Sequence, residues 1–201
     1  MNRGVVILGA GASSRMGRSK LLLPWKGTSI IGHLISRWRQ LGGLQIALVL
    51  PPADRALEDE LNQLKFPTEN RILNPDPARG MFSSIRCAAA WTGWRAPVTD
   101  IAIILGDQPH LRLSTLSSLL EFSDSLPGKI CQPSYGGRPK HPVLLPRLLF
   151  KSLLGEECET LAQFLRLHKA QVELLEIEDE GLARDLDTPA DYEEALRKNP
   201  D

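Results

Sequence analysis

The chain has few cysteine and aromatic residues, and it carries no excess charge of either sign. Its 201 residues include three widely spaced cysteines, which fit neither a disulfide framework nor a zinc ribbon and favour a reducing, cytoplasmic environment. Because 24 Lys and Arg side chains balance 24 Asp and Glu side chains, the charge predicts neither nucleic acid nor a membrane as a partner. No apolar run approaches the ~20 residues of a membrane span, and we expect no secretory signal peptide.

Apolar runs alternate along the chain with amphipathic segments. This alternation predicts an α/β fold, a mostly parallel sheet with helices on both faces, in one domain covering residues 1–201. The expected strands cover 4–8, 45–50, 70–73, 101–105, 129–133, 142–145 and 171–177. The expected helices cover 29–41, 54–64, 82–94, 113–124, 146–154, 159–168 and a last one from 189. The segment 126–145 is rich in proline and glycine and predicts an antiparallel excursion from the sheet.

A glycine-rich turn follows the first expected strand. The apolar run Val5–Leu8 leads into 9–14, whose small residues let the backbone turn tightly and approach a ligand. Three cations, Arg15, Arg18 and Lys20, follow at once. The glycines alone would fit a simple turn between a strand and a helix, but backbone N–H groups next to clustered cations are typical of a polyphosphate site. We therefore expect this segment to bind phosphate.

This turn differs from two familiar glycine-rich loops. The phosphate loop of ATPases requires a Gly-Lys-Ser/Thr triplet, which the sequence lacks. The dinucleotide-binding turn requires a third glycine where Ser14 stands, and an acid about 20 residues further on. The strand at 45–50 ends instead in Pro51-Pro52. A simple dinucleotide-dependent oxidoreductase is therefore disfavoured.

Three further polar motifs stand at strand ends or before the last helix. They are 74–84 (NPDPARGMFSS), 106–109 (GDQP) and 185–189 (DLDTP). In mostly parallel sheets, ligands bind beyond the carboxyl ends of the strands. We therefore expect these motifs to converge with the glycine-rich turn on one edge of the sheet.

Two acids in these motifs are candidate Mg²⁺ ligands. Asp107 follows the apolar run 101–105, so its carboxylate is expected at the edge of the sheet, where it would either cap a turn or bind Mg²⁺ together with phosphate oxygens. Asp187 is the expected second ligand, because 188–191 already carries the signals that start a helix. A plain role at the helix entry is the alternative for Asp187, and Asp185 is a weaker candidate for the metal.

The motif at 74–84 contains polar side chains with two possible roles each. Ser83 and Ser84 would either start the helix at 82–94 or contact a ribose, base or phosphate. Asn74 would either brace the turn or contact the nucleotide. The sequence leaves both alternatives open.

The loop before the strand at 142–145 contains two cations and a histidine. Arg138, Lys140 and His141 together would meet an anionic second substrate, whereas a lone histidine is more often structural. The sequence therefore leaves two roles open for this loop: contact with the second substrate, or a purely structural role of the histidine.

Together these residues resemble the nucleotidyltransferase family of molybdenum-cofactor enzymes. The segment Leu8–Trp25 is similar to the family pattern L-x-A-G-x-S-x-R-M-G-x-x-K-x-L-L-P-W. The resemblance continues, in the same order, through the motifs at 74–84, 106–109, 141–143 and 187–189. Guanylyl-transferring members usually carry Asp-Lys after Arg-Met-Gly, so the segment Lys20–Trp25 resembles the cytidylyltransferase branch instead.

The resemblance implies a GT-A-like, Rossmann-related fold and a Mg²⁺-dependent nucleotidyltransferase. The residues expected to be catalytic are Arg15, Lys20 and Asp107, and those expected to hold the metal are Asp107 and Asp187. The residues expected to bind the nucleotide are Leu8, Gly9, Ala10, Gly11, Ala12, Ser13, Arg15, Lys20, Asn74, Ser83 and Ser84. The residues expected to meet the second substrate are Arg138, Lys140 and His141.

The expected reaction is transfer of CMP from CTP to molybdopterin or its molybdenum-loaded form, with release of pyrophosphate. Transfer of GMP from GTP, or nucleotidyl transfer to another phosphorylated acceptor, is the alternative within this class. A molybdoenzyme that receives the product is a further expected partner. The rival from another class is a non-catalytic accessory protein that binds the cofactor and delivers it to a molybdoenzyme. Paired acids at a phosphate-binding edge argue against a pure carrier.

Overall fold

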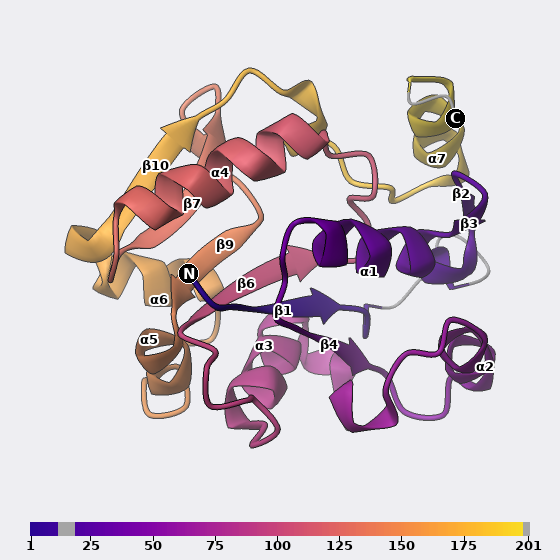
Figure 1. The fold of residues 1–201 in the computed structure, drawn as a ribbon, viewed down its shortest axis with the longest axis horizontal. Coiled ribbons are helices and arrows are strands. Elements are labelled where there is room, and N and C mark those ends of the chain that lie inside the picture. Colours follow the sequence, from indigo (N-terminus) through magenta and orange to yellow (C-terminus); the bar gives the residue numbers. More distant parts are fainter. Residues whose placement is uncertain (12–18, 199–201) are drawn as a thin grey trace.

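A single twisted sheet forms the centre of the molecule. The structure, a computed structural model, describes residues 1–11 and 19–198. Within these residues, eight strands form the sheet in the order β10-β7-β9-β6-β1-β4-β5, and β8 pairs with β7 beside this path (Figure 1). The strands are β1 (Arg3–Leu8), β4 (Gln45–Leu50), β5 (Arg71–Leu73), β6 (Asp100–Leu105), β7 (Ile130–Tyr135), β8 (Arg138–Pro139), β9 (Val143–Pro146) and β10 (Val172–Glu176).

The strands at the middle of the sheet are parallel and buried on both faces. Val6 of β1 lies beside Ala47 of β4 on one side and Ile103 of β6 on the other. Strands buried on both faces have continuous apolar sequences, which is why the runs at 4–8, 45–50 and 101–105 lack a polar alternation. The predicted fold class, a mostly parallel α/β sheet, is confirmed.

The antiparallel excursion predicted for 126–145 is also confirmed. Strand β9 runs antiparallel to both β6 and β7, and β8 forms a hairpin with β7. The turn of this hairpin is Gly136-Gly137, with φ values of 57° and 70°. Two consecutive positive φ angles define the turn that matches the twist of a two-residue hairpin, and glycine adopts them at the least steric cost.

Helices cover both faces of the sheet, as the alternation predicts (Figure 1). They are α1 (Ile30–Gln40), α2 (Arg55–Gln63), α3 (Met81–Ala90), α4 (Leu113–Ser125), α5 (Arg147–Ser152), α6 (Leu161–Leu167) and α7 (Pro189–Lys198). One hydrophobic core joins the sheet to α1, α2 and α4, and includes Val5 and Ile7 of β1. The other joins it to α3, α5 and α6, and includes Val6. Successive residues of β1 thus enter opposite cores.

Side-chain caps fix the starts of several helices. The Ser29 hydroxyl accepts a hydrogen bond from Gly32 N at the start of α1, and the Thr160 hydroxyl accepts one from Gln163 N at the start of α6. Each cap satisfies a backbone donor that has no partner inside the helix. The boundaries of these helices therefore follow directly from local sequence.

Two local predictions differ from the structure. The helix expected at 82–94 ends at Ala90, because Trp91 takes an extended conformation and the chain turns so that Trp94 enters the second core. The Trp94 indole N–H donates to Ala88 O at 3.1 Å, which closes the end of α3. A short hairpin of β2 (Pro24–Trp25) and β3 (Thr28–Ser29) was not predicted; Gly27 at its turn has a φ of 74°.

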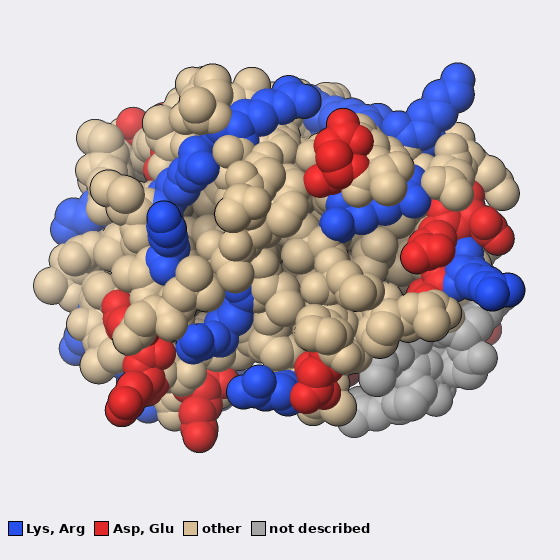
Figure 2. Space-filling view, turned by 90° about the horizontal axis from the view of Figure 1, so that it is seen from below, with Lys and Arg blue, Asp and Glu red and all other residues tan. Residues whose placement is uncertain are grey.

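The charged side chains show no segregation of sign on the face seen in Figure 2. Lys and Arg side chains are interspersed with Asp and Glu side chains there, around a central area of other residues. Among residues 1–11 and 19–198, no helix combines the length and the apolar character needed to cross a membrane.

Candidate active site

The parallel pairing of β1 and β6 brings the ends of two motifs together. Leu8 and Leu105 lie side by side at the carboxyl ends of these strands. The glycine-rich turn continues from the first, and Gly106-Asp107 continues from the second. Gly106 N donates to Leu8 O at 3.2 Å, so the two backbones remain in contact past the last residues of the strands. The predicted convergence of these two motifs is confirmed.

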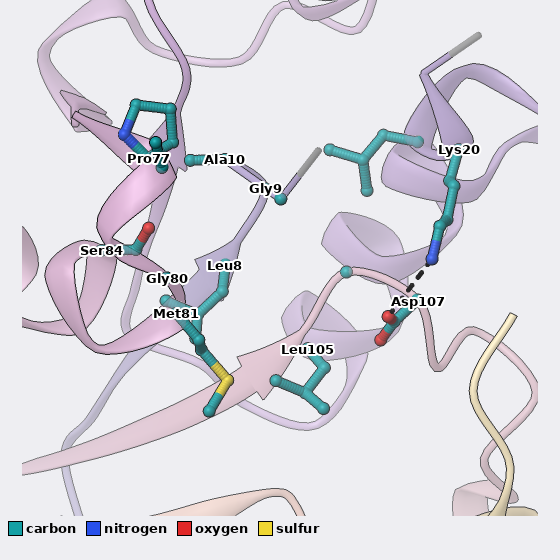
Figure 3. A pocket seen from close by; sticks show the side chains of 14 residues that line it. Leu8, Gly9, Ala10, Lys20, Pro77, Gly80, Met81, Ser84, Leu105 and Asp107 are labelled. Carbon is teal, nitrogen blue, oxygen red and sulfur yellow. Dashed lines mark ion pairs between the residues drawn. The ribbon is translucent and has the colours of Figure 1, made fainter. Parts of the chain in front are cut away.

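A pocket of about 420 Å³ opens at this edge of the sheet (Figure 3). Three segments form its wall: the end of β1 with the turn, the segment before and at the start of α3, and the end of β6. The lining residues are Leu8, Gly9, Ala10, Gly11, Lys20, Leu21, Pro77, Ala78, Gly80, Met81, Ser84, Leu105, Gly106 and Asp107. The wall is thus mostly backbone and apolar side chain, with charged groups at one end, as in sites that bind a base and its phosphates.

The α3 side of the pocket is held in place by Asn74. This buried amide donates to the hydroxyl oxygens of Ser83 at 2.8 Å and Ser84 at 3.0 Å, and its carbonyl oxygen accepts from Asp76 N at 3.0 Å. Gly80 between them has a φ of 86° and precedes the first residue of α3. Asn74 therefore braces the turn, one of the two roles that the sequence allows, whereas Ser84 lies against the pocket itself.

A cation lies between two carboxylates at the charged end of the pocket. Lys20 Nζ is 2.7 Å from Asp187 Oδ1 and 3.7 Å from Asp107 Oδ2. Figure 3 shows the Lys20 side chain pointing from its short helix toward Asp107 at the end of β6. The Lys20 and Asp107 side chains are 15% and 28% exposed, and that of Asp187 is 48% exposed. Residues far apart in the sequence thus form one ionic cluster.

Asp107 is a carboxylate in an unfavourable environment. Burial raises its pKa to about 6, the nearby Asp185 carboxylate contributes in the same direction, and Lys20 opposes both. Its Oδ1 atom is buried and has no hydrogen-bond partner among the described residues. A buried carboxylate oxygen without a donor is suited to a cation.

The donor set fits a hard divalent cation. Asp107 and Asp187 offer carboxylate oxygens 3.7 and 2.7 Å from the same ammonium nitrogen, and Mg²⁺ typically takes one or two carboxylates and completes its shell with phosphate oxygens and water. A metal site built of protein groups alone would need more ligands than these two carboxylates. Among residues 1–11 and 19–198, no group of three or more His, Cys, Asp or Glu side chains is suited to a metal. The arrangement therefore fits a cation that arrives with a phosphate ligand.

The loop that carries Asp107 is fastened to the loop that carries Asp185 and Asp187. Gln108 Nε2 donates to Asp185 Oδ1 at 2.8 Å, and Leu186 N donates to Asp107 O at 3.2 Å. His110 adds a contact of 3.0 Å between its Nε2 and Gly181 O. Reasoning from sequence did not single out Gln108, although its position next to Asp107 at a strand end was a usable signal.

The helix that follows Asp187 starts without using its carboxylate. Thr188 N donates to Asp191 Oδ2 at 2.7 Å, and Asp191 N donates to the Thr188 hydroxyl at 3.2 Å. This reciprocal pair is a capping box, and Pro189 stands at the first helical position. The predicted start of the last helix is confirmed, and Asp187 is engaged by Lys20 instead.

The predicted second-substrate residues do not line the pocket. Arg138 is exposed on β8, and Lys140 is half-buried. His141 contacts Ile103 O through Nδ1 at 3.5 Å, so it lies against the end of β6. Burial lowers the pKa of His141, against the attraction of Asp185, so the imidazole is neutral near pH 7. Any positive charge offered to an anionic substrate here comes from the other two residues.

The remaining predicted residues are distributed as follows. Those that line the pocket are Leu8, Gly9, Ala10, Gly11, Lys20, Ser84 and Asp107. Those outside its lining are Asn74, Ser83, Arg138, Lys140, His141 and Asp187. Ala12, Ser13 and Arg15 lie outside the described residues. The side chains of Pro77, Met81 and Leu105 also line the pocket and were not predicted, because an apolar residue carries no sequence signal that separates lining a pocket from packing in a core.

Gly106 is expected to be intolerant of any side chain. A Cβ atom there would lie 2.8 Å from Leu8 O, a backbone atom that cannot move aside, and 2.8 Å from Leu21 Cδ2. We expect Gly106→Ala to lower the free energy of unfolding by about 1–3 kcal/mol in urea titrations. Gly11→Ala is the matched control, because a Cβ at Gly11 meets no described atom within 4 Å. Equal stability of the two variants would contradict the close approach of the strands.

The fold and the site together define a class of protein. A mostly parallel α/β sheet presents a small-residue turn, a lysine and two aspartates at the carboxyl edge of its strands, beside a pocket large enough for a nucleotide base. Comparison with known proteins then identifies the family. Residues 5–172 match the family model described as MobA-like NTP transferase domain, and the chain belongs to this family.

Relatives within the family differ in the nucleotide that their names specify. The chain is 28% identical over 189 residues to the molybdenum cofactor cytidylyltransferase of Escherichia coli. This alignment covers 93% of this chain and 92% of the relative. It is also 28% identical to the molybdenum cofactor guanylyltransferase of Mesorhizobium japonicum, over 96% of this chain and 93% of the relative. Overall identity therefore does not distinguish the two branches.

A solved structure supports the fold over the whole chain. Rv0371c of Mycobacterium tuberculosis, in complex with manganese, superposes with a TM-score of 0.72 at 25% identity, covering 99% of this chain and 100% of that chain. The fold is thus that of the GT-A-like nucleotidyltransferases, as predicted. A divalent metal occurs in that relative, in keeping with the donor set described above.

Proposed function

We propose that this protein transfers CMP from CTP to the terminal phosphate of molybdopterin or of its molybdenum-loaded form, releasing pyrophosphate. The observation that carries the proposal is the ionic cluster of Lys20, Asp107 and Asp187 at the mouth of a pocket walled by backbone and apolar side chains. A nucleotidyltransferase has to align a triphosphate and neutralise its charge, and this cluster offers both a cation and two potential metal ligands.

The chemistry requires no strong base from the protein. An oxygen of the acceptor phosphate, already anionic near pH 7, forms a bond to the α-phosphorus of CTP. The bond from the α-phosphorus to the oxygen bridging to the β-phosphate breaks, and its electron pair leaves on pyrophosphate. The ammonium of Lys20 would pair with phosphate oxygens and stabilise the charge that develops on the leaving group.

Asp107 and Asp187 would hold the divalent cation. When bound, Mg²⁺ supplies charge neutralisation and orientation of the phosphate oxygens. Asp107 contributes a rigid, largely buried oxygen, because its loop is hydrogen-bonded to the loop 185–187 through Leu186 N and Gln108. Asp187 contributes a more exposed one. Together the two ligands would fix the position of the cation.

The other predicted roles follow the geometry of the pocket. Gly9, Ala10 and Gly11, with Ser84 opposite, would receive the base and ribose. Asn74 and Ser83 would support this wall from behind. Arg138 and Lys140, beside His141, would face the acceptor, since they lie past the far side of β6 from the glycine-rich turn. Ala12, Ser13 and Arg15 are proposed as further triphosphate contacts.

A nucleotide-preference assay tests the proposal. Purified protein, Mg²⁺ and molybdopterin are incubated with CTP, GTP, ATP or UTP in turn, and pyrophosphate release is followed. We expect release with CTP, and no release when Mg²⁺ is removed by chelation. Release with GTP would instead favour guanylyl transfer, which the Mesorhizobium relative supports equally by identity. Absence of release with all four nucleotides would contradict the proposed acceptor.

A further inference from the structure

The position of Lys20 has a consequence for how metal enters the site. Its ammonium lies where a cation shared by Asp107 and Asp187 would lie, 3.7 Å from the Asp107 carboxylate and 2.7 Å from the Asp187 carboxylate; Figure 3 shows the contact with Asp107. The protein without substrate therefore already provides a positive charge for both ligands. A divalent cation and this ammonium cannot both occupy the space between the same two carboxylates, because of their mutual repulsion at such short range.

We propose that Lys20 is an internal counter-ion that excludes divalent metal from the Asp107–Asp187 site until a polyphosphate draws its ammonium away. The proposal rests on the proposed function, since a nucleoside triphosphate is the polyphosphate in question. Metal and nucleotide then enter together, and neither has a high-affinity site in the absence of the other. Lys20 would thereby control when the metal binds, in addition to pairing with phosphate.

The backbone at Lys20 is anchored, so the proposed movement is one of the side chain alone. Lys20 begins the short helix Lys20–Leu22, where Leu23 N donates to Lys20 O at 3.0 Å and Leu21 is buried in the first core. The backbone is therefore anchored. A lysine has a flexible four-carbon stem and a compact charge, so its ammonium can move by several ångströms with no backbone change. Lys20 itself lines the pocket in which the polyphosphate would bind.

The carboxylates, in contrast, would remain in place when the lysine leaves. Leu186 N donates to Asp107 O, and Gln108 holds Asp185, so the two acidic loops move as one unit. The capping box of Thr188 and Asp191 fixes the chain just after Asp187. Departure of Lys20 would remove the ammonium that both carboxylates contact, and it would leave Asp107 with a buried oxygen that lacks a donor among the described residues. That arrangement is the one in which a divalent cation gains most.

The test is a titration of Mn²⁺ in the absence of any nucleotide, followed by the electron paramagnetic resonance signal of free aqueous Mn²⁺. We expect weak binding to the wild-type protein and a Kd at least about tenfold lower for Lys20→Met, which has a similar length but no charge. Lys20→Arg keeps the charge and should bind Mn²⁺ as weakly as the wild type. Lys151→Met removes one exposed cation on α5 and controls for net charge. The double variant Lys20→Met with Asp187→Asn should lose the gained affinity.

A second measurement keeps the test decisive if Lys20→Met is unstable. Adding Mg²⁺ without nucleotide should raise the Tm of Lys20→Met clearly more than that of the wild type or of Lys151→Met. Tight Mn²⁺ binding by the wild-type protein without nucleotide, or equal Kd values for wild type and Lys20→Met, would overturn the proposal. Neither measurement contains nucleotide or acceptor. Their outcome therefore does not depend on whether the protein transfers CMP in the assay above.

Discussion

Replacing Asp107 by asparagine is expected to reduce pyrophosphate release at least about 100-fold in the presence of Mg²⁺. The amide keeps the shape of the side chain and removes the charge that would hold the metal. The neighbouring Asp185 is held by Gln108, so it cannot take over the position of Asp107 without breaking that contact. Near-normal kcat for Asp107→Asn would exclude this residue as a metal ligand.

The same substitution is expected to stabilise the folded protein when no metal is present. The pKa of Asp107 is raised to about 6 in the folded chain, above the ordinary value of about 3.9 for an unfolded aspartate. The folded state therefore binds the proton more tightly, and ionisation costs stability as the pH rises from about 4 to 6. Above pH 6 the ionised Asp107 lowers the free energy of unfolding of the wild type by about 1–3 kcal/mol, after allowance for partial exposure. The asparagine variant carries no charge at this position and avoids this loss.

Unfolding in urea at two pH values measures this effect. At pH 7, with a chelator, Asp107→Asn should be more stable than the wild type, and at pH 4 the two should be nearly equal. The comparison at pH 4 is an internal control, because there the wild-type carboxyl is also neutral in the folded state. The quantity to compare is the stability of Asp107→Asn minus that of the wild type. If this difference were smaller at pH 7 than at pH 4, burial would not raise the pKa of Asp107.

Replacing Lys20 by alanine is expected to lower kcat/KM for CTP by about 100-fold or more. The ammonium lines the pocket and would pair with phosphate oxygens, so its loss leaves the leaving group less stabilised. Both kcat and kcat/KM should fall, since the charge on pyrophosphate develops in the transition state. Pyrophosphate release at varied CTP concentration separates the two parameters.

The matched control for this prediction is Lys151→Ala, which removes a cation from an exposed position on α5 outside the pocket. It should leave both kinetic parameters unchanged. Lys20→Arg should recover part of the activity, because the charge remains although the guanidinium is bulkier. An unchanged kcat/KM in Lys20→Ala would remove Lys20 from the triphosphate site and leave the glycine-rich turn as its principal contact.

Local sequence was sufficient to predict most of the elements and their order, although not the short hairpin of β2 and β3 or the end of α3. The continuous apolar runs at 4–8, 45–50 and 101–105 are typical of strands buried on both faces, and they became β1, β4 and β6. Thr188, Pro189 and Asp191 specified the start of α7 through contacts within four residues. The placement of polar motifs at strand ends followed from the rule that parallel strands present their carboxyl ends together. Each of these inferences depends on interactions close in sequence or on a general property of sheets.

Only the tertiary structure decided which polar residues face one another. The sequence left open whether Asn74 braces a turn, and its hydrogen bonds with Ser83, Ser84 and Asp76 show that it does. The lysine at position 20 and the aspartate at position 187 are separated by most of the chain, and nothing in their local sequence shows that their charges lie 2.7 Å apart. Desolvation of Asp107 likewise arises from neighbours supplied by several elements. Contacts between distant segments depend on how the layers pack. The residues of the ionic cluster could therefore be predicted from the sequence, whereas the distances between them could not.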